Sequence, residues 1–264
     1  MFRKYFEFVR FSHTVFALPF ALASMVVAAG GWPGWRLFGL ILVAMVCART
    51  AAMGFNRIVD RKFDAENPRT KQRHLPAGKI SVQSAYVLTC LSAAGLISAS
   101  WFINRLCFYL SPVAVVVVCF YSLTKRFTDF THVFLGIALG LAPVGAWLAV
   151  TGNWGWPPVV LAAAVVLWLV GFDIIYATQD YEFDKQAGLR SLPVRWGIAG
   201  SLRFAMVAHA VMAVVLAGFG RIAGLGSPYF AALAVIAVCL SGQHWLARKQ
   251  DPVSLNVEIG RAHV

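Results

Sequence analysis

Apolar residues recur along the chain in long runs separated by short polar or Gly/Pro-marked breaks. The runs approach or exceed the roughly 20 residues that an α-helix needs to cross the hydrocarbon core of a bilayer. Dividing the chain at the breaks predicts eight membrane-spanning helices, at residues 14–30, 36–55, 82–102, 106–122, 131–150, 157–178, 201–219 and 228–246. The predicted fold class is therefore an all-α, polytopic membrane helical bundle.

The net charge of +12 raises the question of a nucleic-acid partner, but the distribution of the charge argues against one. Basic residues gather in alternate loops, at 57–79, 125–126 and 185–203, whereas Arg36, Arg105 and Arg221 fall on the opposite side. Loops rich in Lys and Arg remain in the cytoplasm. The sequence thus predicts a multi-pass protein whose partner is the lipid bilayer, with its N-terminus on the cytoplasmic side.

Acidic residues are rare, at 11 in 264, yet two segments share one spacing: Asn56-x-x-x-Asp60-x-x-x-Asp64 and Tyr176-x-x-x-Asp180-x-x-x-Asp184. Carboxylates are costly near a membrane, so two clusters with matching spacing indicate a shared ligand, most simply a divalent cation. Residues at i, i+4 and i+8 fall on roughly one face of a helix. Both segments belong to loops predicted to be cytoplasmic.

The two segments also define an internal repeat. Asp60 and Asp180 are offset by 120 residues, and each segment continues into Arg-x-Leu-Pro, at Arg73 and at Arg190. The repeat predicts two pseudo-repeated four-helix halves, with an acidic segment after the second helix of each. Two such faces meeting in the interior of a bundle would place four Asp side chains around one cavity.

This composition favours a magnesium-diphosphate site. Mg²⁺ prefers oxygen ligands and is held by one or two carboxylates together with substrate phosphates. The predicted metal ligands are Asp60, Asp64, Asp180 and Asp184. Nearby cations suited to phosphate oxygens are Arg57, Lys71, Arg73, Lys125, Arg126, Lys185 and Arg190. The alternative for these cations is that they only fix the membrane topology.

Three further polar residues accompany the second segment or the apolar runs. Asp173 lies seven residues before Asp180, among apolar residues, and an acid inside a membrane helix is a functional candidate. It could orient a cation, take a proton from an acceptor, or be a structural partner for a hydroxyl or amide in a neighbouring helix. Tyr176 could supply an aromatic face or a hydroxyl. His209, within an apolar run, is expected to be a packing residue.

The residues Asn56 to Asp64, followed by Asn67-Pro-Arg-Thr-Lys-Gln-Arg73 and Leu75-Pro-Ala-Gly78, resemble the first signature of UbiA-type intramembrane prenyltransferases. The segment from Gly171 to Asp184 resembles the second Asp-rich motif of that family, and the segment 121–128 resembles its basic loop. The similarity extends from about Ser12 to Arg195. One departure is His74, where Arg-Pro-Leu-Pro is usual, and it puts the local turn in doubt.

The resemblance implies a nine-helix bundle that joins a polyprenyl diphosphate to an aromatic acceptor with Mg²⁺, in a bacterial-type cytoplasmic (inner) membrane. It assigns Asp60 and Asp64 to one magnesium-diphosphate shell and Asp180 and Asp184 to the other, with Asn56 supporting the first. Arg73, Lys125 and Arg126 match positions that bind diphosphate or an acceptor carboxylate. The predicted catalytic residues are Asp60, Asp64, Asp173, Tyr176, Asp180 and Asp184.

The favoured acceptor is 4-hydroxybenzoate, in quinone biosynthesis, and the alternative within the family is a dihydroxynaphthoate in menaquinone biosynthesis. An alternative from another class is a secondary transporter, because transporters also carry internal repeats and buried acids. The sequence predicts neither the oligomeric state nor the prenyl chain length.

The end of the chain departs from the rest. Residues 258–264, Glu-Ile-Gly-Arg-Ala-His-Val, correspond to a common sequencing-adapter read translated in frame. We therefore expect a single transmembrane domain over residues 1–257, truncated before its ninth helix, followed by an artefactual heptapeptide.

Overall fold

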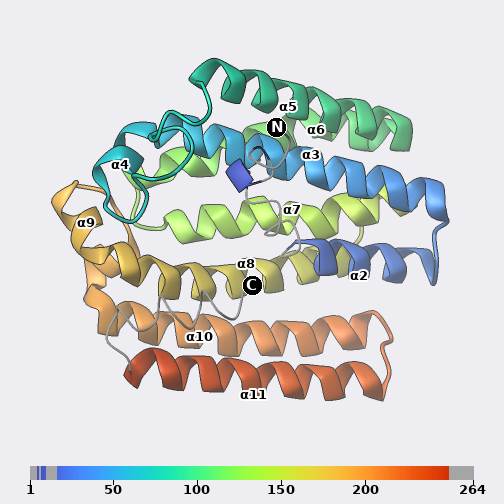
Figure 1. The fold of residues 1–264 in the computed structure, drawn as a ribbon. Coiled ribbons are helices and arrows are strands. Elements are labelled where there is room, and N and C mark those ends of the chain that lie inside the picture. Colours follow the sequence, from blue (N-terminus) through green and yellow to red (C-terminus); the bar gives the residue numbers. More distant parts are fainter. Residues whose placement is uncertain (1–4, 6, 10–16, 250–264) are drawn as a thin grey trace. The chain divides into compact units, whose positions relative to one another are not determined.

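The computed structural model describes residues 5, 7–9 and 17–249, and the regular secondary structure of this part of the chain is all helical, without a strand (Figure 1). The α-helices are α2 (Leu18–Ala29), α3 (Trp35–Val59), α4 (Arg61–Glu66), α5 (Val82–Ile103), α6 (Arg105–Phe120), α7 (Thr131–Thr151), α8 (Trp156–Ala177), α9 (Tyr181–Gln186), α10 (Leu192–Ile222) and α11 (Ser227–Lys249). Two 3₁₀-helices, η2 (Tyr121–Arg126) and η3 (Thr178–Asp180), lie among them. The predicted all-α class is confirmed.

Seven helical segments are long and apolar enough to cross a membrane, so the protein is a multi-pass membrane protein. The expected count of eight spans is corrected to seven within the described residues. The difference is at the first expected span, 14–30, where α2 has 12 residues. A helix of that length extends about 18 Å, less than the roughly 30 Å of the hydrocarbon core.

Short polar caps separate consecutive spans. Ser81 caps the N-terminus of α5, and its side chain accepts a hydrogen bond from the Ser84 N–H at 3.1 Å. Asn104 alone separates α5 from α6, and its Oδ1 accepts from the Cys107 N–H at 2.8 Å. Side-chain oxygens at these positions satisfy amide groups that the first turn leaves without partners. Both α5 and α6 therefore begin with a capped first turn.

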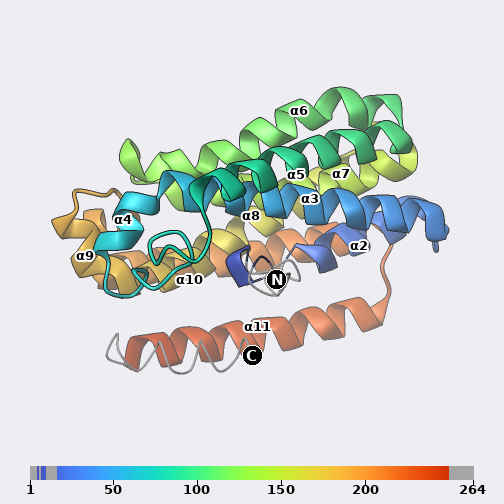
Figure 2. The same ribbon diagram turned by 45° about the horizontal axis from the view of Figure 1, so that its top comes forward.

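The chain divides into two compact units: residues 1–123 with 137–162, and residues 124–136 with 163–264. In the first unit, α3 and α5 run side by side, and α6 packs against both (Figures 1 and 2). Its core includes one cluster around Met53 and Leu75 and another around Met25 and Ile41. The first acidic segment belongs to this unit.

A close approach holds α3 against α5. A Cβ added at Gly54 would clash with the Thr89 side chain, whose hydroxyl donates to the Ala85 carbonyl at 2.8 Å. Gly39, on the same helix, has open space where its Cβ would be. Only a residue without a side chain fits at position 54, which fixes the packing of these helices two residues before Asn56.

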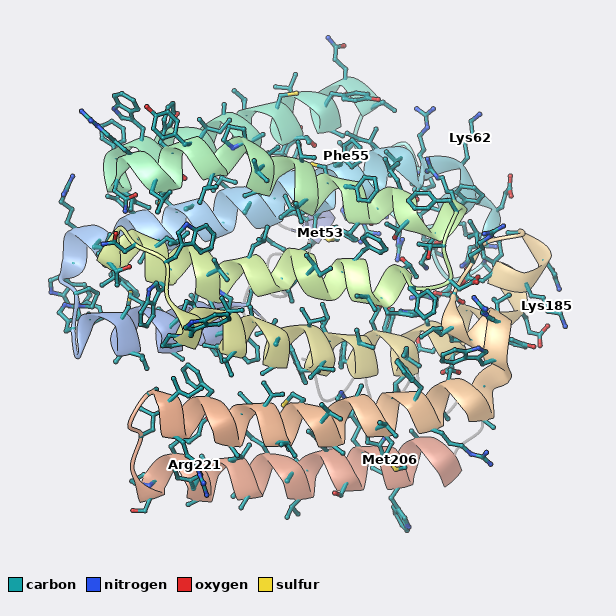
Figure 3. The ribbon with its side chains drawn as sticks, turned by 180° about the vertical axis from the view of Figure 1, so that it is seen from behind. Met53, Phe55, Lys62, Lys185, Met206 and Arg221 are labelled. Atoms are coloured by element: carbon teal, nitrogen blue, oxygen red, sulfur yellow. The ribbon has the colours of Figure 1, made fainter. Side chains whose placement is uncertain are left out.

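The second unit is built on the end of α8 together with α10 and α11. Its core centres on Val170, Ile174 and Leu192. The α10 helix is interrupted at Gly197, whose φ of +70° is favoured for glycine. Figure 3 shows Lys185, on α9, and Arg221, near the end of α10, at opposite ends of this unit.

His209 is buried in the second unit with defined partners, rather than acting as a packing residue alone. Its Nδ1 lies 2.8 Å from His244 Nε2, and its Nε2 lies 3.0 Å from the Trp168 carbonyl. The Trp168 carbonyl can only accept, so His209 Nε2 donates and His244 Nε2 donates to His209 Nδ1. This pair links α8, α10 and α11.

Exposed aromatic residues mark one end of the first unit. Trp35 begins α3, Trp101 lies in the last turn of α5, and Trp156 begins α8, with exposures of 77%, 63% and 78%. Tryptophan concentrates where membrane helices meet the lipid headgroups. These residues therefore indicate a membrane interface at the end of the unit opposite to the loop 67–81.

The expected boundaries near the C-terminus remain predictions. Residues 258–264 lie outside the described residues, as does the predicted position of a ninth helix.

Candidate functional site

The first acidic segment covers the end of one helix and the start of the next. Asp60 lies at the junction of α3 and α4, with φ −89° and ψ 3°. The backbone hydrogen bonds continue through it: the Asp60 N–H donates to the Asn56 carbonyl at 3.0 Å, and the Asp64 N–H donates to the Asp60 carbonyl at 2.8 Å. The three residues thus occupy successive turns, but not one uninterrupted helix as the spacing suggested.

The side chains of this segment are paired within the first unit. Asn56 Nδ2 donates to Asp60 Oδ2 at 3.0 Å, as expected for a residue that supports a ligand. Arg73 Nη1 donates to Asp64 Oδ1 at 2.6 Å, and Arg57 Nη1 lies 3.8 Å from Asp64 Oδ2. Asp64 is 6% exposed, and its Oδ2 has no hydrogen-bond partner among the described residues. A buried carboxylate oxygen of this kind suits a bound cation.

A tight turn after α4 presents Arg73 to Asp64. The Lys79 N–H donates to the His74 carbonyl at 2.8 Å, and the Gly78 N–H donates to the Leu75 carbonyl at 3.1 Å. Gly78 has a φ of +68°, which explains glycine at this position. The turn is therefore intact with His74 in place of the usual proline.

His74 itself is partly buried near the N-terminal segment. Its Nε2 lies 3.7 Å from Glu7 Oε2, and its ring meets the Phe8 ring edge-on. Burial lowers the pKa of His74 below its ordinary value; Glu7 opposes this shift, and the charges of Lys79 and Arg57 add to it. The imidazole is accordingly neutral at pH 7.

The second acidic segment repeats the helix break. Asp180 ends η3 and precedes α9, with φ −101° and ψ 7°, close to the values at Asp60. The same i to i−4 backbone hydrogen bond ends both short helices, from Asn67 to Phe63 and from Ala187 to Phe183. The sequence repeat is thus also a repeat of local structure.

A cation also accompanies the last aspartate of the second segment. Asp184 is 2% exposed, and Lys125 Nζ lies 3.9 Å from its Oδ2. Arg190 holds this basic loop, because its backbone N–H donates to the Lys125 carbonyl and its Nη1 donates to the Phe127 carbonyl, both at 2.9 Å. Arg190 and Arg73, equivalent in the repeat, therefore have different roles: one fixes a loop and the other pairs with a carboxylate.

Asp173 has a partner on a neighbouring helix. His132 Nδ1, near the start of α7, lies 2.6 Å from Asp173 Oδ2. Asp173 therefore has a structural partner on a neighbouring helix, but that partner is an imidazole and not the hydroxyl or amide that the sequence suggested.

The remaining predicted residues are less enclosed. Tyr176 is partly buried, one turn before Asp180, while Lys71, Arg126 and Lys185 are exposed. Lys185 extends outward from α9 (Figure 3), with its Nζ 5.8 Å from the centre of the Tyr181 ring. Neither Lys71 nor Lys185 pairs with a carboxylate in the part of the chain that the structure describes.

Sequence reasoning missed two polar residues at these segments. Arg49 lies within α3. Its guanidinium and that of Arg57 both interact electrostatically with the Tyr121 hydroxyl. A basic residue inside an apolar helix was a usable signal. His132 gave no comparable signal, because its partner is 41 residues away.

The model of the UbiA prenyltransferase family matches residues 17–258. The chain belongs to this family. The recognition made from the acidic segments is confirmed, and the protein is a prenyltransferase of the UbiA family.

Individual UbiA relatives agree with this assignment. The 4-hydroxybenzoate octaprenyltransferase of Cupriavidus necator is 32% identical over 232 residues, which cover 87% of this chain and 80% of that protein. The apo structure of a UbiA homologue from Aeropyrum pernix K1 is 29% identical, with a TM-score of 0.83 over 94% of each chain. A UbiA homologue from Archaeoglobus fulgidus, solved bound to GPP and Mg²⁺, shares the fold at 22% identity, with a TM-score of 0.74 over 98% of this chain and 95% of that one.

Proposed function

We propose that this UbiA-family enzyme transfers a polyprenyl group from a polyprenyl diphosphate to 4-hydroxybenzoate, with Mg²⁺ as cofactor. The observation that carries the choice of acceptor is the 32% identity, over 87% of the chain, to a protein named 4-hydroxybenzoate octaprenyltransferase. The reaction forms a bond between the allylic carbon and a ring carbon, and it releases diphosphate and a proton.

The acidic residues fit magnesium. Each segment offers two carboxylates, and the buried Asp64 Oδ2 has no hydrogen-bond partner among the described residues. Within those residues no group of three or more His, Cys, Asp or Glu side chains gathers, so phosphate and water would complete the coordination, as is usual for Mg²⁺. The proposed ligands are Asp60, Asp64, Asp180 and Asp184. Bound there, Mg²⁺ would neutralise the diphosphate and favour its departure.

The paired cations are proposed to bind diphosphate oxygens. Arg73 and Arg57 lie next to Asp64, and Lys125 lies next to Asp184. Arginine offers a planar fork and lysine a point charge, and both take up the negative charge that develops as the allylic C–O bond breaks. Arg190 supports Lys125 through its loop. The exposed Lys71, Arg126 and Lys185 are proposed to attract the anionic substrate.

The carboxylate of the acceptor needs a cation deeper in the membrane than the diphosphate. Arg49 suits this role, because it lies 11 residues before Asp60 along α3, about 16 Å by helical rise, and its Nε is buried. A partly buried arginine in a membrane helix is a candidate for binding an anionic partner. Tyr176, one turn before Asp180, is proposed to present its ring to the developing allylic cation.

The location and orientation follow from charge. The loop 67–81 carries Lys71, Arg73 and Lys79, whereas the other end of the first unit carries Arg36 and Arg105. We infer that both acidic segments face the cytoplasm and that the protein resides in a cytoplasmic (inner) membrane. A reporter fused after Arg36 is expected to lie outside the cytoplasm, and a cytoplasmic reporter would contradict this orientation.

The direct test is product formation. Membranes containing the protein are incubated with a polyprenyl diphosphate, Mg²⁺, and either 4-hydroxybenzoate or a dihydroxynaphthoate, with and without chelator. Chelator-sensitive prenylation of 4-hydroxybenzoate is expected. Prenylation of the naphthoate alone would change the acceptor, and counterflow of a labelled solute without any product would instead indicate a transporter.

A further inference from the structure

His132 and Asp173 form a hydrogen-bonded pair within the second unit. The distance from His132 Nδ1 to Asp173 Oδ2 is 2.6 Å. His132 is completely buried, whereas the Asp173 side chain is 24% exposed. The imidazole is thus the enclosed member of the pair, and the carboxylate is the partly exposed one.

The chemistry of the two groups locates the proton between them. An ionised carboxylate can only accept a hydrogen bond, so His132 Nδ1 carries the proton and donates it. His132 Nε2 is buried and has no hydrogen-bond partner in the described part of the chain. A proton on Nε2 would have no acceptor there, so the geometry places the N–H of the imidazole on Nδ1, toward Asp173.

Packing around His132 restricts its position. The hydroxyl of the preceding Thr131 lies 2.8 Å from that of Thr124, and both residues are buried. One turn later, a Cβ added at Gly136 would lie 3.0 Å from the Val166 Cα and carbonyl oxygen. The start of α7 therefore lies close against α8, and His132 directs one oxygen of Asp173 while leaving the other available.

Asp173 lies on the membrane side of the second acidic segment. It lies on α8, seven residues before Asp180 at the end of η3, which is about two helical turns or a rise of about 10 Å. If Asp180 binds the diphosphate as proposed, the reacting prenyl carbon and the aromatic ring lie toward Asp173. The hydrogen on the attacked ring carbon must be lost in that region.

We propose that Asp173 accepts the proton lost from the aromatic ring and that His132 is the residue that positions it. This inference rests on the proposed function and deepens the same site. The allylic C–O bond breaks with its electron pair leaving on diphosphate, and a π pair of the ring forms the new C–C bond. The C–H bond at that carbon then breaks, its electrons restore aromaticity, and the proton passes to an oxygen of Asp173, which later releases it to water.

The test compares 4-hydroxybenzoate with the same acid deuterated at ring positions 3 and 5. Proton loss from the ring is fast when the base is in place, so the wild type is expected to show an isotope effect of about 1. In Asp173→Asn and His132→Leu, turnover is expected to fall about 100-fold and the isotope effect to rise to about 2 or more, because proton removal becomes limiting. The amide of His132→Asn can donate from nearly the position of Nδ1. This variant is therefore expected to have most of the wild-type turnover and an isotope effect close to that of the wild type.

His209→Leu provides a matched control, because His209 is another buried histidine of the second unit with its own hydrogen bonds. Its isotope effect should equal that of the wild type. A thermal midpoint in detergent shows whether each variant is folded. If His132→Leu keeps the wild-type isotope effect, whether its turnover is retained or reduced, the positioning role is wrong.

A spectroscopic measurement tests the pair without turnover. Among the six histidines, ¹⁵N NMR of labelled protein should detect an Nδ1–H tautomer that disappears in His132→Asn and shifts in Asp173→Asn. If the ¹⁵N signal of His132 is the same in Asp173→Asn as in the wild type, the hydrogen-bonded pair is wrong, even if prenyl transfer is observed. Absence of product from the wild type with either acceptor, with this signal intact, would instead overturn the proposed function.

Discussion

Asp60 and Asp180, 120 residues apart, have nearly the same backbone conformation, with φ and ψ of −89° and 3° at the first and −101° and 7° at the second. Each stands immediately before a six-residue helix. This region of φ and ψ is sparsely populated and is common among active-site residues. The two halves of the motif are therefore matched in local geometry as well as in sequence.

The hydrogen bond from Asn56 to Asp60 should tune metal binding. Asn56→Leu removes the group that orients the Asp60 carboxylate, and loss of such a supporting contact costs about 10- to 100-fold in metal affinity. The Mg²⁺ concentration that gives half-maximal turnover should rise accordingly. Asn153→Ala, at an exposed position between α7 and α8, should leave it unchanged. An unaltered Mg²⁺ dependence in Asn56→Leu would remove Asn56 from this role.

Arg73 should contribute to stability through Asp64. Removing its charge in Arg73→Leu leaves Asp64, whose side chain is 8% exposed, with Arg57 at 3.8 Å as its nearest cation in the described structure. The expected loss is about 2–3 kcal/mol in the free energy of unfolding, read as a lower thermal midpoint in detergent. Lys71→Leu, two residues away and exposed, should change it by less than about 0.5 kcal/mol. Equal shifts in the two variants would contradict the pairing.

The acidic segments show what sequence could and could not predict. Their spacing, the offset of 120 and the flanking cations predict Asp60, Asp64, Asp180 and Asp184 as metal ligands, because these features are local. The break in the helix at Asp60 could not be predicted from the spacing, because Asp60 and Asp64 keep the i to i−4 backbone hydrogen bonds of a continuous helix. The spacing is the same whether or not the helix is interrupted.

His74 should make stability depend on pH. Its pKa is lowered in the folded protein, so the unfolded chain binds the proton more readily and stability increases with pH in this range. The contribution of neutral His74 to the free energy of unfolding is fully present above the pKa of His74 in the unfolded chain, about 6.5. It is lost as the pH falls toward the pKa of His74 in the folded protein. Thermal midpoints at pH 7.5 and 5.5 should therefore differ less in His74→Gln than in the wild type. A difference as large as that of the wild type would contradict this.

Two glycines on α3 test the packing that supports the first segment. Gly54→Ala forces a Cβ into Thr89 and should cost about 1–3 kcal/mol. Gly39→Ala meets nothing within 4 Å and should be neutral or stabilising by up to about 1 kcal/mol. Thermal midpoints of the two variants should shift in different directions or by clearly different amounts. A stable Gly54→Ala variant would mean that α3 and α5 pack less closely.

Contacts between distant helices set the limit of the sequence reasoning. The apolar runs predicted the spans because membrane helices need long uninterrupted hydrophobic stretches. The partner of Asp173 depends on how α7 meets α8, which no periodicity encodes. The first span was overcounted because hydropathy alone does not show where α2 begins.

The most direct measurement of the central claim is prenylation of 4-hydroxybenzoate as Mg²⁺ is varied, in the wild type, Asp60→Asn, Asp180→Asn and the double variant. If both segments are required for the same prenyl transfer, each single variant should lose about 100-fold or more in turnover, and the double variant should lose little further, since residues that act as a unit are not additive. A folded Asp60→Asn or Asp180→Asn protein with near-normal turnover would contradict the account.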